Sequence, residues 1–176
     1  KMPDDYDPRS RPWYKDAMAA GATTLTEPYV DAATGELIIT IATPAKPAGV
    51  VGGDLSLKTL VDIINSLDFD GLGYAFLVSA DGKILVHPDK NLVMKSLADV
   101  FPENTPRIGS ALSEAASNGQ TRILTFAPVQ GLPSVNWYVG LSIDKTKAYA
   151  ALSDFRASAI VATLIAVVLI ILLLSM

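Results

Sequence analysis

The sequence predicts an α+β fold of two small modules with antiparallel sheets, followed by a helix that crosses a membrane. Three observations predict it. Short β-rich runs are joined by hairpin turns at Ala33-Thr34-Gly35 and Asp81-Gly82. A strand leads directly into a helix twice, near residues 51–57 and again near residues 139–145. No residue from 157 to 176 carries a charge.

The first module is expected over residues 1–67. After a polar opening loop, a short helix begins at Pro12, because proline is favoured in a first helical turn, and ends at Gly21. Strands are expected at residues 29–31, 36–43 and 50–55. Ser56 can then cap a helix with one apolar stripe, formed by Leu57, Leu60, Val61, Ile64 and Leu67.

The second module is expected over residues 68–144. Its strands are predicted at residues 74–79, 83–87, 121–127 and 136–143. The stretch 88–106 contains three prolines and is interpreted as a loop. The spacing of Ile108, Leu112 and Ala115 or Ala116 predicts a helix that ends at Asn118-Gly119. Residues 145–176 form an exit helix that continues into the membrane.

The membrane segment is expected at about residues 157–176. At helical rise this length spans about 30 Å, the thickness of a bilayer's hydrocarbon core. Its only polar side chains are those of Ser158, Thr163 and Ser175, so it lacks the polar face of an ordinary core helix. The charges that precede it are mixed in sign and do not set its orientation.

Composition excludes several functional classes. There is no cysteine, so neither a disulfide framework nor thiolate chemistry is available. The net charge is −4 and no basic run occurs, which argues against nucleic-acid binding. The single histidine, His87, has no partner ligands nearby, so the sequence predicts neither a metal site nor a cofactor. No nucleophile elbow or phosphate-binding loop is present, and the chain is not expected to be an enzyme.

Groups suited to a zwitterion are crowded between residues 6 and 54. An α-amino acid needs a planar cation for its carboxylate, which Arg11 offers, and a carboxylate for its ammonium, which Asp54 offers. The indole N–H and the phenol groups nearby can wall the pocket and bond to either end. The candidate ligand-binding residues are Tyr6, Arg11, Trp13, Tyr14, Tyr29, Asp31 and Asp54.

Each of these residues also has a structural explanation. Arg11 could be a surface arginine, and Trp13 and Tyr14 could be ordinary core aromatics. Asp54 could cap the helix that begins near Leu57. Only their combination favours a binding site.

The stretch Asp7-Pro8-Arg9-Ser10-Arg11-Pro12-Trp13-Tyr14-Lys15-Asp16-Ala17 resembles the signature of double-Cache (dCache) sensor domains of bacterial methyl-accepting chemotaxis proteins. The spacing of Tyr6, Arg11, Trp13 and Tyr14, with Asp54 some forty residues later, is similar to the amino-acid-binding subset. The resemblance continues through residues 73–88, which look like the opening hairpin of a membrane-proximal Cache module. It implies tandem PAS-like modules, the membrane-distal one holding the ligand.

The resemblance also implies a role for each candidate. Arg11 and Trp13, with Tyr6, would hold the ligand carboxylate, and Tyr14 and Asp54 would hold the ammonium. Tyr29 and Asp31 would line the pocket.

The expected function is therefore that of a non-enzymatic sensor region of a chemoreceptor in the inner (plasma) membrane. Its sensor part would be periplasmic or extracellular and would bind an L-amino acid for chemotaxis. Alternatives are the same sensor fused to a histidine kinase or a cyclic-dinucleotide enzyme, a sensor for amines or organic acids, and a membrane-anchored structural module without a ligand.

The family pattern further implies a homodimer and a cytoplasmic signalling domain beyond this chain. The start of the chain departs from the pattern. The family's first membrane helix, its stalk helix and the first strands of the distal module are absent, so the distal module is expected to be incomplete.

Overall fold

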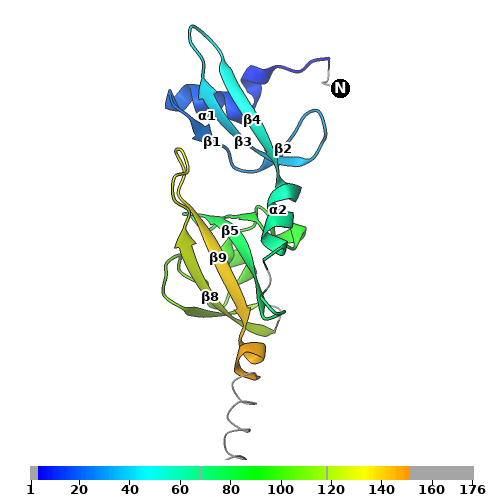
Figure 1. The fold of residues 1–176 in the computed structure, drawn as a ribbon, viewed down its shortest axis with the longest axis vertical. Coiled ribbons are helices and arrows are strands. Elements are labelled where there is room, and N and C mark those ends of the chain that lie inside the picture. Colours follow the sequence, from blue (N-terminus) through cyan, green and yellow to red (C-terminus); the bar gives the residue numbers. More distant parts are fainter. Residues whose placement is uncertain (1–3, 68, 118, 151–176) are drawn as a thin grey trace, which may run out of the picture.

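The computed structural model describes residues 4–67, 69–117 and 119–150, and shows two antiparallel sheets joined by a helix (Figure 1). The predicted membrane segment, residues 157–176, lies outside the described residues. Within the part of the chain that is described, no helix is long and apolar enough to cross a membrane. Residues 145–150 are helical and follow directly on the last strand.

The first sheet is built around one long central strand. It contains β1 (Thr24–Leu25), β2 (Tyr29–Val30), β3 (Leu37–Pro44) and β4 (Val50–Ser56). The short strands β1 and β2 pair in succession along β3, and β4 also pairs with β3. All pairings are antiparallel, as the hairpin signals predicted.

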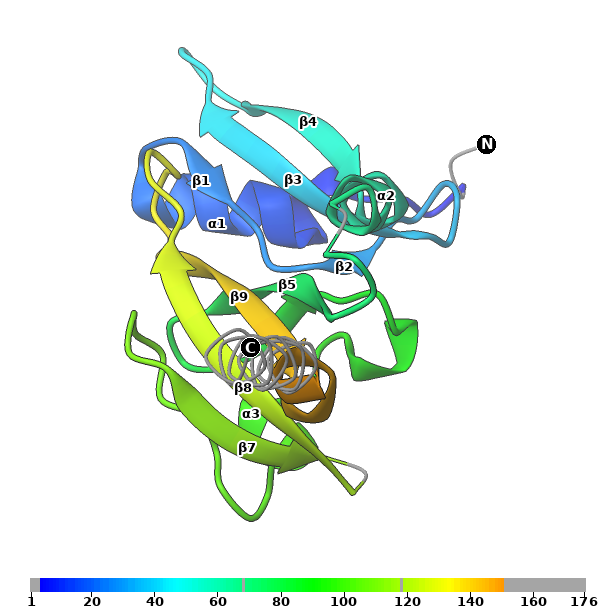
Figure 2. The same ribbon diagram turned by 60° about the horizontal axis from the view of Figure 1, so that its bottom comes forward.

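Helix α1 (Pro12–Ala20) lies beside β3 on one face of this sheet (Figure 2). A short turn, η1 (Pro8–Ser10), precedes it. The helix begins at proline and ends at Gly21, whose left-handed φ of 62° suits glycine. The small side chain of Ala17 is fully buried, which lets the helix approach the strands closely.

The second sheet has the strand order β6-β5-β9-β8-β7. Its members are β5 (Gly73–Ser79), β6 (Ile84–Val86), β7 (Ser113–Ser117), β8 (Gln120–Pro128) and β9 (Trp137–Asp144). One face carries a core centred on Phe76, Leu124 and Phe126, onto which Leu97 and Phe101 pack. Gly140 on β9 makes room for this core, because a Cβ there would lie 2.5 Å from the Phe76 ring.

Helix α2 (Leu57–Asn65) connects the two sheets. Its residues Leu57 and Val61 are buried in a cluster that includes Ile39 of the first sheet and Leu85 and Trp137 of the second. The two sheets therefore share one hydrophobic cluster through this helix. The predicted division at residues 67 and 144 remains an interpretation of the sequence.

Three local predictions were wrong. Residues 113–117 form strand β7, not the end of a helix, because backbone hydrogen bonding to β8 outweighs the weak helical spacing of Ala115 and Ala116. The stretch interpreted as a loop contains η2 (Lys90–Leu92) and α3 (Leu97–Val100). Helix α2 ends at Asn65, so Leu67 lies beyond its stripe and is half exposed.

His87 has a structural role in the second sheet's core. It is 5% exposed, its ring lies 4.8 Å from that of Tyr74, and its Nδ1 accepts a hydrogen bond of 2.9 Å from the Asp89 backbone N–H. Burial lowers the pKa of His87 from its ordinary value. Among the described residues, no cluster of three or more His, Cys, Asp or Glu side chains is placed to hold a metal ion.

We expect the stability of the protein to fall on acidification because of His87. The folded-state pKa is lowered, so below about pH 6.5 the unfolded chain binds a proton on this imidazole while the folded chain resists it. The free energy of unfolding should decrease from pH 7 to pH 5 by at most about 1.4 kcal/mol per pH unit. Urea unfolding at several pH values measures this slope.

The control is His87→Asn, which keeps an acceptor for the Asp89 N–H without a group that titrates in this range. Its slope should be nearly flat. An unchanged slope in His87→Asn would show that another group is responsible.

A second prediction concerns Gly140. The substitution Gly140→Ala should lower the free energy of unfolding by about 1–3 kcal/mol, because the added Cβ overlaps the buried Phe76 ring. Gly109→Ala is the matched control, since no atom lies within 4 Å of a Cβ built at Gly109. Equal effects in urea unfolding of the two variants would contradict the proposed packing constraint.

Candidate ligand-binding site

Four of the predicted site residues, Arg11, Trp13, Tyr29 and Asp54, gather on the face of the first sheet that α1 covers. Thr40 on β3 pairs with Asp54 on β4, and Ala42 pairs with Gly52. Because paired residues share a face and alternate residues repeat it, Thr40, Ala42, Gly52 and Asp54 point the same way. Trp13 of α1 lies over this face, since a Cβ at Gly52 would be 3.5 Å from its ring.

A chain of two short hydrogen bonds crosses this face. The Tyr29 hydroxyl lies 2.6 Å from Thr40 Oγ1, and Thr40 Oγ1 donates to Asp54 Oδ1 at 2.6 Å. Thr40 is 1% exposed, whereas Asp54 is exposed. Asp54 therefore does not cap α2. One oxygen of its carboxylate accepts a hydrogen bond from the buried Thr40 hydroxyl, and the carboxylate is otherwise exposed.

Arg11 lies at the start of α1, next to Tyr29. Its Nη2 donates to the carbonyl oxygen of Val30, and its guanidinium carbon lies 5.3 Å from the centre of the Tyr29 ring. The side chain is half-buried, and the ring face is a favourable position for a cation. Arg11 is thus a fixed residue of the site, not a freely solvated surface arginine.

Tyr29 lies between the positively charged Arg11 and the negatively charged Asp54. Burial raises its pKa from the ordinary value. The negative charge of Asp54 raises the pKa further, while the Thr40 hydrogen bond and the Arg11 charge oppose this. These influences show that Arg11, Asp54 and also Tyr6 are electrostatic neighbours of one phenol, which stays protonated at neutral pH.

The remaining aromatic candidates are Tyr6, Trp13 and Tyr14. The Trp13 and Tyr14 rings meet edge to face with centroids 5.7 Å apart, and both side chains are half-buried, as is that of Tyr6. Half-burial leaves part of each ring accessible, unlike the fully buried rings of Phe76 and Phe126 in the second sheet. This differs from the exposure of ordinary core aromatics.

The Asp31 carboxylate is hydrogen-bonded within a turn, unlike the other candidate side chains. Its Oδ2 accepts hydrogen bonds from the Thr34 backbone N–H at 3.0 Å and from Thr34 Oγ1 at 2.8 Å. The Thr34 hydrogen bond is the main cause of the lowered pKa of Asp31. The structure thus uses this carboxylate in the β2–β3 turn, and its role in ligand binding stays a prediction.

Sequence reasoning missed Thr40, the residue that joins Tyr29 to Asp54. A signal was present, because Thr40 is the only hydroxyl-bearing residue among the apolar residues 37–42 of its strand. A polar group that is buried needs a hydrogen-bond partner. The sequence alone did not indicate which group would be that partner.

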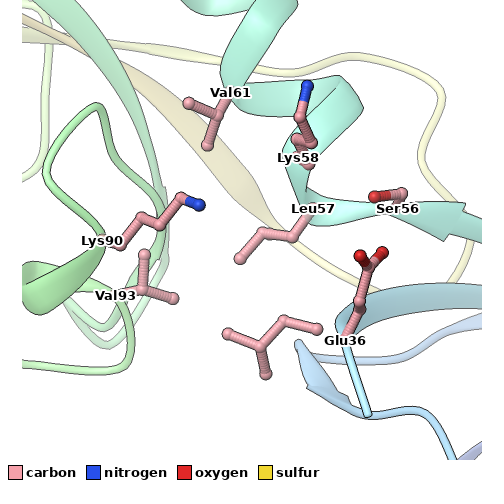
Figure 3. Close-up of a pocket in the computed structure, with 8 residues that line it drawn as sticks. Glu36, Ser56, Leu57, Lys58, Val61, Lys90 and Val93 are labelled. Atoms are coloured by element: carbon pink, nitrogen blue, oxygen red, sulfur yellow. The ribbon is translucent and has the colours of Figure 1, made fainter. Parts of the chain in front are cut away.

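Hollows lie elsewhere in the described part of the chain, two of them at α2 and between the sheets. A cavity of about 220 Å³ opens where α2 begins, with Leu57, Val61 and Val93 on its wall (Figure 3). An apolar groove of about 530 Å³ lies between the sheets, lined among others by Ile41, Leu55 and Val139. None of the seven predicted residues lines either one.

Two antiparallel sheets joined by a helix define an α+β domain, which carries a charged and aromatic cluster at α1. The Cache domain family model matches residues 2–152, and the chain belongs to this family.

Its relatives are bacterial chemotaxis proteins. The methyl-accepting chemotaxis protein PctB of Pseudomonas aeruginosa is 66% identical over 179 residues, which cover 99% of this chain and 28% of PctB. The solved ligand-binding domain of PctB, in complex with L-Arg, superimposes with a TM-score of 0.81 at 66% identity and covers 85% of this chain and 66% of that domain.

A second solved structure is similar. The ligand-binding domain of the Pseudomonas fluorescens chemoreceptor CtaA, in complex with L-isoleucine, gives a TM-score of 0.78 at 62% identity, over 86% of this chain and 64% of that domain. The chain thus spans just over a quarter of PctB and about two thirds of these domains. The names of these proteins agree with the expectation of a ligand-binding chain that is not an enzyme.

Proposed function

We propose that this chain is the extracytoplasmic sensor region of a chemoreceptor and that it binds an L-amino acid under α1. One observation carries the proposal. Arg11 and Asp54 lie on either side of Tyr29, yet among the described residues they form no ion pair with each other. The opposite charges are held apart, each by a separate contact with the chain.

This separation suits a zwitterion. The planar guanidinium of Arg11 can bind a carboxylate through two donors, and Asp54 can accept from an ammonium. Trp13, Tyr14 and Tyr6 offer aromatic surface and further hydrogen-bonding groups beside the two charges. A structural module without a ligand predicts that Arg11 and Asp54 point to solvent or to each other. Asp54 is exposed on one side, but the Thr40 hydrogen bond fixes its carboxylate, and Val30 and Tyr29 fix Arg11. Both charged groups are thus held in place by the protein without pairing with each other, which favours a binding site over that alternative.

The relatives support the choice of ligand class. The two solved domains described above hold L-Arg and L-isoleucine, which share only the α-amino acid group. At more than 60% identity to both, this chain is expected to bind the same common group. Which side chain it prefers depends on residues outside the Arg11–Asp54 pair.

A physical connection exists from the site to the end of the described chain. Asp54 lies on β4 just before α2, and Leu57 and Val61 of α2 pack against the second sheet. The last strand of that sheet leads into the helix at residues 145–150, where Lys145 pairs with Glu114 at 2.6 Å. A ligand that favours one position of β4 would shift the population of positions of this helix.

The proposed location, membrane attachment, oligomeric state and output follow from the same similarity. We place the sensor region outside the cytoplasm, attached to the inner membrane by the apolar segment at residues 157–176, and acting as a homodimer. Identity of 66% to a chemotaxis protein favours a chemotaxis output over a histidine kinase or a cyclic-dinucleotide enzyme.

The test is isothermal titration calorimetry of the purified protein against the common L-amino acids. At least one should bind, and Arg11→Ala and Asp54→Ala should each weaken it by about 10- to 100-fold, the usual loss for a hydrogen bond to a charged group. Asp54→Ala should spare ligands that have a carboxylate but no amine, whereas Arg11→Ala should weaken them.

Two matched controls come from the chain itself. Arg9→Ala removes an exposed arginine of the same motif that pairs with Asp7, and Asp62→Ala removes an exposed aspartate that pairs with Lys58. Neither should change affinity. If the folded protein gives no binding with any amino acid, the amino-acid assignment is wrong, and amines and organic acids become the ligand classes to titrate.

A further inference from the structure

Thr40 occupies an unusual position for a hydroxyl group. It lies near the middle of β3, is 1% exposed, and is surrounded in the sequence by Ile38, Ile39 and Ile41. Its backbone is fixed by Thr26, whose N–H donates to the Thr40 carbonyl oxygen and whose Oγ1 accepts from the Thr40 N–H, both at 3.0 Å. The hydroxyl is therefore held in place by a rigid strand.

The number of protons sets the direction of the hydrogen-bond chain. A threonine hydroxyl has one proton, and a carboxylate can only accept, so the Thr40 proton goes to Asp54. The contact between Tyr29 and Thr40 at 2.6 Å is then a hydrogen bond only if the phenol donates. The chain runs from Tyr29 through Thr40 to Asp54.

This direction decides what the site offers to a ligand. The Tyr29 proton is committed to Thr40, so the phenol oxygen presents a lone pair. Within the described chain, Asp54 has no hydrogen bond other than the one from Thr40, so its second oxygen is also an acceptor. Two acceptors suit an ammonium with its three donors and repel a carboxylate. Arg11, which has only donors, lies on the Tyr29 ring instead.

We propose that Thr40 is a positioning residue that makes this end of the site selective for an amine, by orienting the Asp54 carboxylate and turning the Tyr29 hydroxyl into an acceptor. The inference rests on the proposed binding of amino acids under α1. It assigns Tyr29 to the ammonium side of the ligand. It also explains why a hydroxyl is buried on β3, where an apolar residue would otherwise pack.

The test compares Thr40→Val, which removes the hydroxyl at similar shape, with Thr40→Ser, which keeps it. Calorimetry would use L-arginine, L-isoleucine and any other L-amino acid that the wild-type protein binds, with the matching carboxylic acids that lack the α-amine. Thr40→Val should weaken amino-acid binding about tenfold and change binding of the acids little, so that the preference for an amine shrinks. Thr40→Ser should retain the preference.

Tyr29→Phe tests the same chain without a change in the core of the sheet. It should weaken amino-acid binding in the wild-type background and have little further effect in the Thr40→Val background, because the two groups act as one unit. If Thr40→Val does not fold, as judged by thermal unfolding, Tyr29→Phe alone decides, and it should reduce the preference for an amine over the matching acid.

The outcomes distinguish the role of Thr40 from the amino-acid-receptor assignment. Binding of an amino acid by the wild-type protein, with equal amine preference in Thr40→Val, Thr40→Ser and Tyr29→Phe, would overturn the role of Thr40 and leave the receptor assignment intact. A uniform loss of affinity for amines and acids alike would assign Thr40 a purely structural role and overturn the inference as well. Absence of amino-acid binding in the wild-type protein would overturn both.

Discussion

The structure depends on the pairing of β3 with β4. Seven residue pairs align Ile38–Pro44 with Val50–Ser56, and this register places Thr40 opposite Asp54. A slip by one residue would turn Asp54 to the opposite face, away from α1 and Tyr29. The same register sets where β4 ends and α2 begins, at Leu57. One strand pair thus fixes both the candidate site and the helix that leads away from it.

The two faces of the first sheet differ in polarity. The face under α1 is polar at its centre, where Tyr29, Thr40 and Asp54 are joined by hydrogen bonds. The opposite face carries Ile39, which belongs to the hydrophobic cluster shared with α2 and the second sheet. Period-two alternation along β3 therefore connects a polar binding surface to an apolar junction through the thickness of one strand. A shift of β3 would therefore move both the polar residues under α1 and the apolar cluster around Ile39.

Much of the fold, and the residue types that make up the candidate site, could be predicted from local sequence. Pro12 and Gly21 mark the ends of α1, and turn residues such as Asp81-Gly82 mark hairpins, because these residue types restrict or permit particular backbone angles. The motif around Arg11 and Trp13 was visible because its residues are close in sequence. Strand β7 was not predicted, since Ala115 and Ala116 have little preference of their own and take their conformation from β8.

The sequence by itself determined the α+β composition, the hairpin turns and the identities of the charged and aromatic groups, because each depends on residues that are neighbours along the chain. Only the tertiary structure decided how these groups are used. It committed the Asp31 carboxylate to a turn, placed Arg11 on the Tyr29 ring, and inserted the Thr40 hydroxyl between Tyr29 and Asp54. Residues 11, 29, 40 and 54 meet only when α1 and three strands pack together, and hydrogen bonds act over distances that sequence spacing does not specify.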